Sequence, residues 1–296
     1  MKRIAIILFL FISTYVSIFG SPQAPEFIVI GKDTFAIYQL PIIGLKDRME
    51  RKLYRMLWKE GNIDKYEIPH GLARGYRALW EIVDNKLYLI KILNISDSDS
   101  DIVLRKTFGK KFQSGKVHAD WFTGDIAVSK DKLLRWDGIF SRTHMSEDIY
   151  QFINGNLVNK EFVNNYIDLP NGINRINDNP YEFTYTEIVD TIFHFIKQLD
   201  WTTLSEINDC GCDDSYEITI DENGKIGDIE LIPFHDTPEE RLADIKDHEE
   251  CIRQFKAKLN HLQFDIIKWN GRPYKEKIPF DIFYTVDGEL ENCTYH

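Results

Sequence analysis

The first part of the chain contains aromatic and ionisable residues that could form a binding or catalytic cleft. Carbohydrate and peptide sites commonly combine aromatic side chains with a few carboxylates and a histidine. A structural role is the alternative, because Trp and Tyr at alternate strand positions usually pack in a core or pair across strands, while Asp and His cap turns. The candidate residues are Trp80, Glu81, Asp120, Trp121, His144 and Tyr150.

Hydrolysis of glycan or cell-wall material would require Asp120 and His144 to approach each other beside a further acid. The motifs GxSxG, HExxH, GxGxxG and the P-loop are absent, so serine hydrolysis, zincin proteolysis and nucleotide chemistry have no sequence support. Ser129 and Lys132 match SxxK, but they lie in a charged loop without the companion motifs. We therefore predict no catalytic residue, and we keep a hydrolase as the alternative function.

Four cysteines, Cys210, Cys212, Cys251 and Cys293, lie in the last third of the chain. An even number favours disulfides in an oxidising compartment, and a bridge between Cys210 and Cys212 would be strained. We expect a link from this pair to Cys251 or Cys293, although the sequence leaves the pairing open. Zinc bound with His235 or His248 is the alternative, but the spacing is not that of a zinc site.

Asp97, Asp99 and Asp101 have the opening spacing of a calcium loop. Ile102 occupies the position where glycine must make the turn, and no glutamate follows at the twelfth position. We predict a solvated acidic loop here. No metal ion or other cofactor is expected.

The N-terminus has the pattern of a signal peptide. Lys2 and Arg3 precede an apolar run that begins at Ile4, and we assign residues 1–20 to the signal, with the cleavage site left open. An uncleaved anchor is the alternative, since the run approaches the length of a membrane helix. The pattern predicts a periplasmic or secreted bacterial protein without a membrane span after removal of the signal.

Net charge argues against nucleic acid as a partner. The formal charge is -11, and loss of two cations with residues 1–20 makes it about -13. The remaining length suits two domains. A turn-rich stretch, residues 170–181, is predicted to be a linker between a β-rich domain (25–169) and a second domain (182–296).

The first domain is predicted to be mostly antiparallel β structure with a helix over Lys46–Trp58. In the second, a helix begins near Thr184, a hairpin turns at Asp221–Gly224, and one long helix runs from Pro238 to Leu262. The fold class is therefore α+β. The strands expected in the first domain are Phe27–Ile30, Thr34–Leu40, Tyr76–Ile82, Lys86–Ile92, Ile126–Val128 and Gln151–Phe162.

A final strand is expected over Ile278–Val286. Pro279 removes a backbone donor from it, which is typical of a sheet edge. Ile278, Phe280 and Ile282 share one face of this strand and are candidate binding residues.

Three segments, Tyr216–Ile226, Lys268–Pro273 and Lys277–Ile282, resemble a TonB C-terminal-like domain. The resemblance covers about residues 184–286 and implies an α+β module in the periplasm that binds a partner peptide by strand addition. The long, stiff spacer of an energy transducer is missing here. Segments of the first domain, Gly75–Leu89 and His118–Ile126 among them, resemble secreted bacterial β-rich proteins, a resemblance that implies no activity.

Two functions of different classes follow. The first is a secreted or periplasmic non-catalytic binding protein that engages a protein or peptide partner, with the C-terminal sheet edge as the binding element. The second is the hydrolase described above. The oligomeric state is left open by the sequence.

Overall fold

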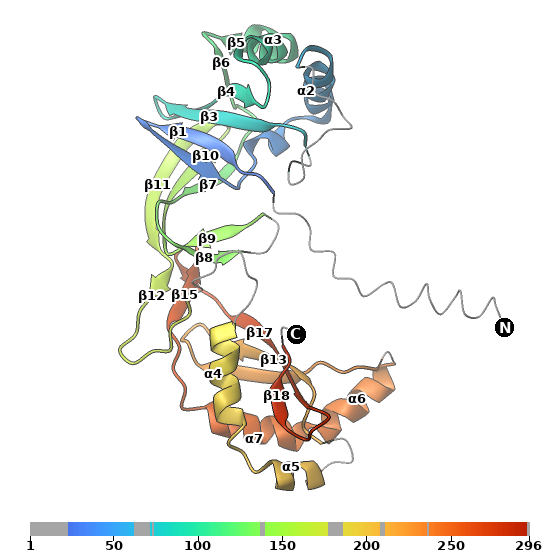
Figure 1. Ribbon diagram of the computed structural model, residues 1–296. Coiled ribbons are helices and arrows are strands. Elements are labelled where there is room, and N and C mark those ends of the chain that lie inside the picture. The colour runs from blue at the N-terminus through green and yellow to red at the C-terminus, as the bar shows by residue number, and fades with distance from the viewer. Residues whose placement is uncertain are drawn as a thin grey trace, which may run out of the picture. The chain divides into compact units, whose positions relative to one another are not determined.

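The computed structural model describes residues 23–61, 72, 74–136, 140–176, 186–207, 211–235 and 237–294 (Figure 1). The predicted signal peptide, Cys210 and residues 177–181 of the predicted linker lie outside these ranges. The chain is α+β, with helices and several β-sheets.

The chain forms two compact units, and the boundaries between them do not lie at residues 170–181. The strands β7 (Gly124–Val128), β10 (Ser146–Ile153) and β11 (Asn156–Asn164) each run from one unit into the other. Because the chain passes repeatedly between the units, a single linker cannot separate them. The first unit comprises Met1–Ile126, Trp136–Ser141 and Gln151–Val158, and the second comprises Ala127–Arg135, Arg142–Tyr150 and Asn159–His296.

The largest sheet has the strand order β2-β1-β3-β4-β11-β10-β7, with β6 also paired to β4 and β5 to β6. β1 runs parallel to β3, whereas the pairs β1–β2, β3–β4, β4–β6, β5–β6 and β4–β11 are antiparallel. The further strands are β1 (Glu26–Ile30), β2 (Asp33–Ile37), β3 (Arg77–Val83), β4 (Lys86–Leu93), β5 (Phe112–Gln113) and β6 (Lys116–His118).

The expected strand over Gln151–Phe162 is in fact two strands, β10 and β11. Asn154 and Gly155 between them have φ values of 50° and 72°, the left-handed conformation at both central positions of a tight hairpin turn. Asp84 and Asn85 make the same kind of turn between β3 and β4, with φ values of 50° and 59°.

Residues 97–108 form helix α3 (Asp97–Phe108), so the prediction of a solvated acidic loop is wrong. The Ser96 side chain accepts a hydrogen bond from Asp99 N at 3.1 Å and caps the helix, and the acidic residues of the first turn suit its positive end. Val103, Leu104 and Phe108 are buried, and Lys52 of helix α2 (Asp47–Glu60) donates to Thr107 O. Two 3₁₀ turns, Pro41–Gly44 and Gly109–Lys111, complete these connections.

In the second unit, a sheet of order β14-β13-β17-β18 is antiparallel throughout. Its strands are β13 (Ser215–Ile220), β14 (Ile226–Leu231), β17 (Glu276–Tyr284) and β18 (Leu290–Asn292). The inward side chains join those of α4 (Thr186–Ile196), α5 (Trp201–Ile207) and α7 (Glu249–Leu259) in one core. Figure 1 shows α4 and α7 beside this sheet.

The single helix predicted from Pro238 to Leu262 is two helices, α6 (Pro238–Asp247) and α7. His248 separates them with φ -94° and ψ 2°. The predicted continuous apolar stripe is therefore interrupted, and α6 places no buried residue in the core, whereas Cys251, Phe255 and Leu259 of α7 are fully buried.

Short strands form two smaller sheets. Outside these strands, Ile173 forms an isolated β-bridge with Phe264, so the beginning of the predicted linker is packed against the C-terminal segment. The strands are β12 (Tyr166–Ile167), β15 (Ile266–Trp269) and β16 (Arg272–Pro273) in one sheet, and β8 (Leu133–Trp136) and β9 (Arg142–His144) in the other.

A buried ion cluster connects distant segments of the second unit. Both oxygens of the buried Glu276 carboxylate accept hydrogen bonds, from Arg135 and from the fully buried Arg175. Arg135 Nη1 also donates to Arg175 O at 2.8 Å, and Arg175 Nη1 donates to Asp265 O at 3.0 Å. Burial by itself would raise the pKa of Glu276, but the two guanidinium groups outweigh it and lower that pKa to about 2.

Asp265 extends this cluster toward β12. Its carboxylate accepts hydrogen bonds from the Tyr166 hydroxyl and, at 2.8 Å, from Leu169 N. Burial and the bond to Asp265 raise the pKa of Tyr166, which keeps the hydroxyl protonated as a donor. Residues 166–176 are thus fixed to the C-terminal sheet by charge and hydrogen bonding.

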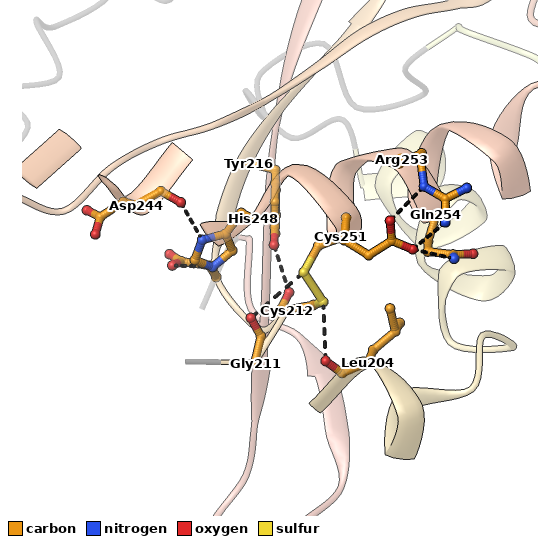
Figure 2. Close-up of a disulfide and its surroundings, with 11 residues drawn as sticks. Leu204, Gly211, Cys212, Tyr216, Asp244, His248, Cys251, Arg253 and Gln254 are labelled. Carbon is orange, nitrogen blue, oxygen red and sulfur yellow. Dashed lines mark hydrogen bonds and ion pairs between the residues drawn. A yellow bond between two sulfur atoms is a disulfide. The ribbon is translucent and has the colours of Figure 1, made fainter. Parts of the chain in front are cut away.

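A disulfide joins Cys212 to Cys251, with a Cα–Cα distance of 5.6 Å, and both residues are buried (Figure 2). The bridge ties the chain entering β13 to the first turn of α7. Cys293 is the free cysteine of the described residues. Neither Cys212 nor Cys251 is available as a zinc ligand in this state, which removes the zinc alternative for those two residues.

Glu276→Gln should destabilise the protein by roughly 3–5 kcal/mol, because the fully buried Arg175 would lose the carboxylate that pairs with it. Urea unfolding measures this change. Since the pKa of Glu276 lies at about 2 rather than 4.5, its contribution should be complete above pH 4.5 and disappear as the pH falls toward 2. Lys277→Gln, which breaks the neighbouring exposed pair with Glu217, is the matched control and should change stability little. Equal effects of the two variants would contradict the assigned role.

Cys212→Ala combined with Cys251→Ala should lower stability by about 2–4 kcal/mol, since the bridge restricts a separation of 39 residues in the unfolded chain. Denaturant unfolding under non-reducing conditions tests this, with Cys293→Ala as the control. The same loss in the control, or none in the double variant, would argue against a stabilising bridge.

Candidate functional site

Trp80 lies in the core of the first unit. Its indole Nε1 donates to Glu26 Oε2 at 2.6 Å, and Arg74 Nη1 lies 3.2 Å from Glu26 Oε1. Trp80 and Glu26 are fully buried. Burial raises the pKa of Glu26 to about 7, although Arg74 and the Trp80 hydrogen bond act in the opposite direction.

Trp121 lies against Trp80, as a shared cleft would require, but the contact is one of packing. The two ring centroids are 6.5 Å apart in an edge-to-face arrangement, and Trp121 stacks on Phe108 at 5.5 Å. Trp121 Nε1 donates to Pro41 O at 2.9 Å. These contacts match the structural interpretation of the tryptophans.

Glu81 and Asp120 each face a lysine near the surface. Asp120 pairs with Lys111 at 2.6 Å, and Glu81 lies 4.0 Å from Lys116. Asp120 belongs to the first unit and His144 to the second. Asp120 has its ionic partner Lys111 within the first unit, and His144 has its partner Glu147 within the second.

His144 is held by a buried carboxylate. Glu147 Oε1 accepts hydrogen bonds from His144 N at 3.0 Å and from His144 Nδ1 at 3.1 Å, while Glu147 Oε2 accepts one from Asn165 Nδ2 at 2.9 Å. Asn165 Oδ1 in turn accepts from Gly271 N. This geometry holds the ring through Nδ1, so Nε2 is the ring nitrogen that Glu147 does not contact.

Among the residues that the structure describes, no Ser, Thr or Cys side chain hydrogen-bonds to His144. The histidine thus has an orienting carboxylate but no nucleophile beside it. Tyr150, in the same unit, is buried, with Lys160 Nζ 5.0 Å from its ring centroid. The network around His144 joins β9 and β10 to the β15–β16 hairpin.

Ile278, Phe280 and Ile282 are fully buried in the core of the second unit. Their strand, β17, is not terminal in its sheet, because β13 pairs along one side and β18 pairs with residues 282–284 on the other. A partner therefore cannot reach these three side chains without unfolding the core. β17 lies next to the terminal strand β18, which pairs only with residues 282–284, so Pro279 lies near the sheet edge as predicted, although β17 is not the terminal strand.

β14 is the terminal strand at the end of this sheet opposite β18. Ile232 N donates to Ser215 O, which places the backbone groups of residues 228, 230 and 232 toward β13. Because strand residues alternate in direction, the N–H and C=O groups of Ile229 and Leu231 face outward. Their side chains are nevertheless buried in the core.

One of these outward groups is already occupied. Ile229 N donates to Asp228 Oδ1 at 2.9 Å, and Lys256 of α7 pairs with the same carboxylate. The hydrogen bond from Lys256 is the largest of the effects that lower the pKa of Asp228. The outward groups left for a partner are Leu231 N–H, Leu231 C=O and Ile229 C=O. Charges at alternate positions of Ile226–Leu231 were a sequence signal for an edge strand.

No group of three or more His, Cys, Asp or Glu side chains within the described ranges could hold a metal ion. His248 Nδ1 lies 2.8 Å from Asp244 O (Figure 2). His235 pairs with the Asp244 carboxylate at 2.7 Å. In the described part of the chain, no helix has the length and apolar character needed to cross a membrane.

Glu26→Gln should remove a pH dependence of the first unit. Between about pH 4.5 and 7 the unfolded chain has lost a proton that folded Glu26 retains, so wild-type stability should fall by roughly 3 kcal/mol across this window. The variant keeps an acceptor for Trp80 and should lack this fall. Tryptophan-monitored unfolding at pH 4.5 and 7.5 measures it, with Glu81→Gln as the control. An unchanged slope in Glu26→Gln would show that Glu26 is ionised throughout.

Comparison with protein-family models, with curated proteins and with solved structures finds no match to this chain. Its function is therefore inferred from its own residues. Of the features above, the outward-facing backbone of β14 has the clearest chemical use.

Proposed function

We propose that this chain is a non-catalytic binding protein of the bacterial periplasm or extracellular space. Its second unit would bind an extended segment of a protein or peptide as an additional strand beside β14. The signal-like N-terminus and the Cys212–Cys251 disulfide support an oxidising compartment. The resemblance to TonB C-terminal-like domains supports the same class of function, with a different strand as the binding edge.

The observation that carries the proposal is the pair of outward-facing residues on β14. Leu231 offers one N–H and one C=O to a neighbouring strand, and Ile229 offers a C=O. In water these groups bond to solvent, and an added strand replaces those bonds in a fixed register. The buried side chains of Ile229 and Leu231 anchor the edge, so it is presented on a rigid support.

Asp228 and Lys256 would regulate access to this edge. The Asp228 carboxylate occupies Ile229 N–H, and Lys256 holds the carboxylate in place. Charged groups of this kind prevent edge strands from pairing indiscriminately. A correct partner must displace the carboxylate, which lowers affinity and raises selectivity.

A hydrolase of glycan or cell-wall material is the second candidate. The orientation of His144 by Glu147 is the observation that favours it. It lacks a nucleophile bonded to the histidine among the described residues, and Asp120 is paired with Lys111 instead. The binding function has support from backbone geometry that this candidate does not have.

Peptides selected on the full chain from a random twelve-residue phage-displayed library should protect the Leu231 amide from hydrogen exchange, by at least about tenfold at saturation. The Phe280 amide, bonded within the sheet, should not change. Asp228→Ala should strengthen peptide binding about fivefold, because it frees one backbone donor worth about 1 kcal/mol. Glu217→Ala, which removes another lysine-paired carboxylate of the same sheet, serves as the control.

Selected peptides that leave the Leu231 amide unprotected would exclude strand addition at β14. Equal affinities of wild type and Asp228→Ala would remove the regulatory role of that carboxylate.

A further inference from the structure

Exposed apolar side chains gather immediately after β14, on the connection to α6 and on α6 itself. Phe234 is 93% exposed and Leu242 is 68% exposed, with Ile232 at 44% and Ile245 at 39%. Single exposed apolar residues are common, but four within fourteen positions of sequence form a feature that needs an explanation. We call these four residues the β14–α6 surface.

Polar contacts join His235 to α6. His235 Nδ1 donates to Asp244 Oδ2 at 2.7 Å, and Arg241 Nε donates to His235 O at 2.7 Å. Thr237 caps α6 by accepting from Glu240 N and bonds to the Glu240 carboxylate as well. Phe234 is therefore exposed next to a residue that is bonded to α6.

Helix α6 has no packing role that would account for its apolar residues. Leu242 and Ile245 are three positions apart and share one face, yet none of the residues of α6 is buried. In Figure 1, α6 lies at one end of the second unit, away from α4. An amphipathic helix with an uncovered apolar face is a typical docking element.

The charge around this surface indicates the chemistry of the partner. From Asp228 to Glu250 the chain carries nine carboxylates and two cations, Arg241 and Lys246. Lys256, Lys277 and Arg253, from outside this span, pair with Asp228, Glu230 and Glu250, which leaves six carboxylates against the two cations. Such an excess attracts lysine and arginine and repels anionic lipid headgroups. A basic protein segment with apolar side chains is complementary to both features, whereas an anionic membrane is not.

We infer that the β14–α6 surface binds the residues that flank the added strand, and that these residues are basic and apolar. The inference rests on the proposed function and specifies its partner. Phe234 and Leu242 contact apolar side chains of the bound segment, and the surrounding carboxylates pair with its lysines or arginines. The strand edge supplies register, and this surface supplies the sequence preference.

The test uses a library-selected peptide rebuilt as three versions, with lysine, glutamine or glutamate at the flanking positions. We expect the lysine version to bind the full chain at least tenfold more tightly than the glutamate version at low salt, with a smaller ratio at high salt. Phe234→Ser combined with Leu242→Ser should reduce binding of the lysine version at least tenfold. Val286→Ser, at an exposed apolar residue away from this surface in sequence, is the matched control.

Both substituted residues are exposed, so the double variant should fold, and circular dichroism verifies this. Equal binding of the three peptides, or full binding by the double variant, overturns the inference while Leu231 protection still supports strand addition. Binding of the chain to phosphatidylglycerol vesicles through Phe234 and Leu242 overturns it in favour of a membrane surface. A library that yields no binder contradicts the proposed function and this inference together.

Discussion

The buried Glu276 carboxylate, held between Arg135 and Arg175, is the interaction on which the second unit depends. Its partners lie 141 and 101 residues away in sequence. A buried ion is tolerated only when it is paired and hydrogen-bonded, so the three segments must fold together or not at all. Arg175, Asp265 and Glu276 are buried in this cluster, and Arg135 is partly buried beside them. The C-terminal sheet is thereby joined to β8 and to residues 166–176.

This constraint explains why the domain boundary could not be located from the sequence. Residues 170–181 have the Asn, Gly and Pro content of a linker, and a charged residue such as Arg175 is usually exposed. Only the distant partners of Arg175 make its burial favourable. Sequence patterns were more informative where contacts between neighbouring residues determine the structure, as in the hairpin at Asp221–Gly224. There Asp221 Oδ1 accepts from Asn223 N and Lys225 N, and Gly224 adopts φ +74°.

Helix α3 and the break at His248 show the limits of pattern analysis in the helices. Three alternating aspartates were assigned to a solvated acidic loop, although Ser96 before them was a capping signal for a helix. The stripe from Leu242 to Leu262 suggested one buried helix, but the Cys212–Cys251 bridge and the core fix only α7. The apolar residues of α6 were placed on the same helix as those of α7, whereas they belong to a separate helix and are exposed.

The candidate site residues show the same difference between local contacts and contacts with distant segments. The partly buried Trp121 packs against Trp80 of the first unit's core, and His144 has its partner three residues away in Glu147. The edge strand was assigned to β17 because Pro279 lacks a donor, but strand order depends on β18, whose pairing no local pattern reveals. The candidate site that remains consists of the outward-facing backbone groups of β14. These groups belong to the second unit, which the Glu276 ion cluster holds together.

Native-state hydrogen exchange of the free protein tests this account most directly, by comparing the adjacent amides of Leu231 and Ile232. Ile232 N–H is bonded to Ser215 O inside the sheet, whereas Leu231 N–H faces outward. The account predicts exchange of Ile232 only through opening of the whole second unit, together with Asp265, whose N–H is bonded to Ile173 O, and near-intrinsic exchange of Leu231. Equal protection of Leu231 and Ile232, or early exchange of Asp265, would contradict an open edge on a support of this kind.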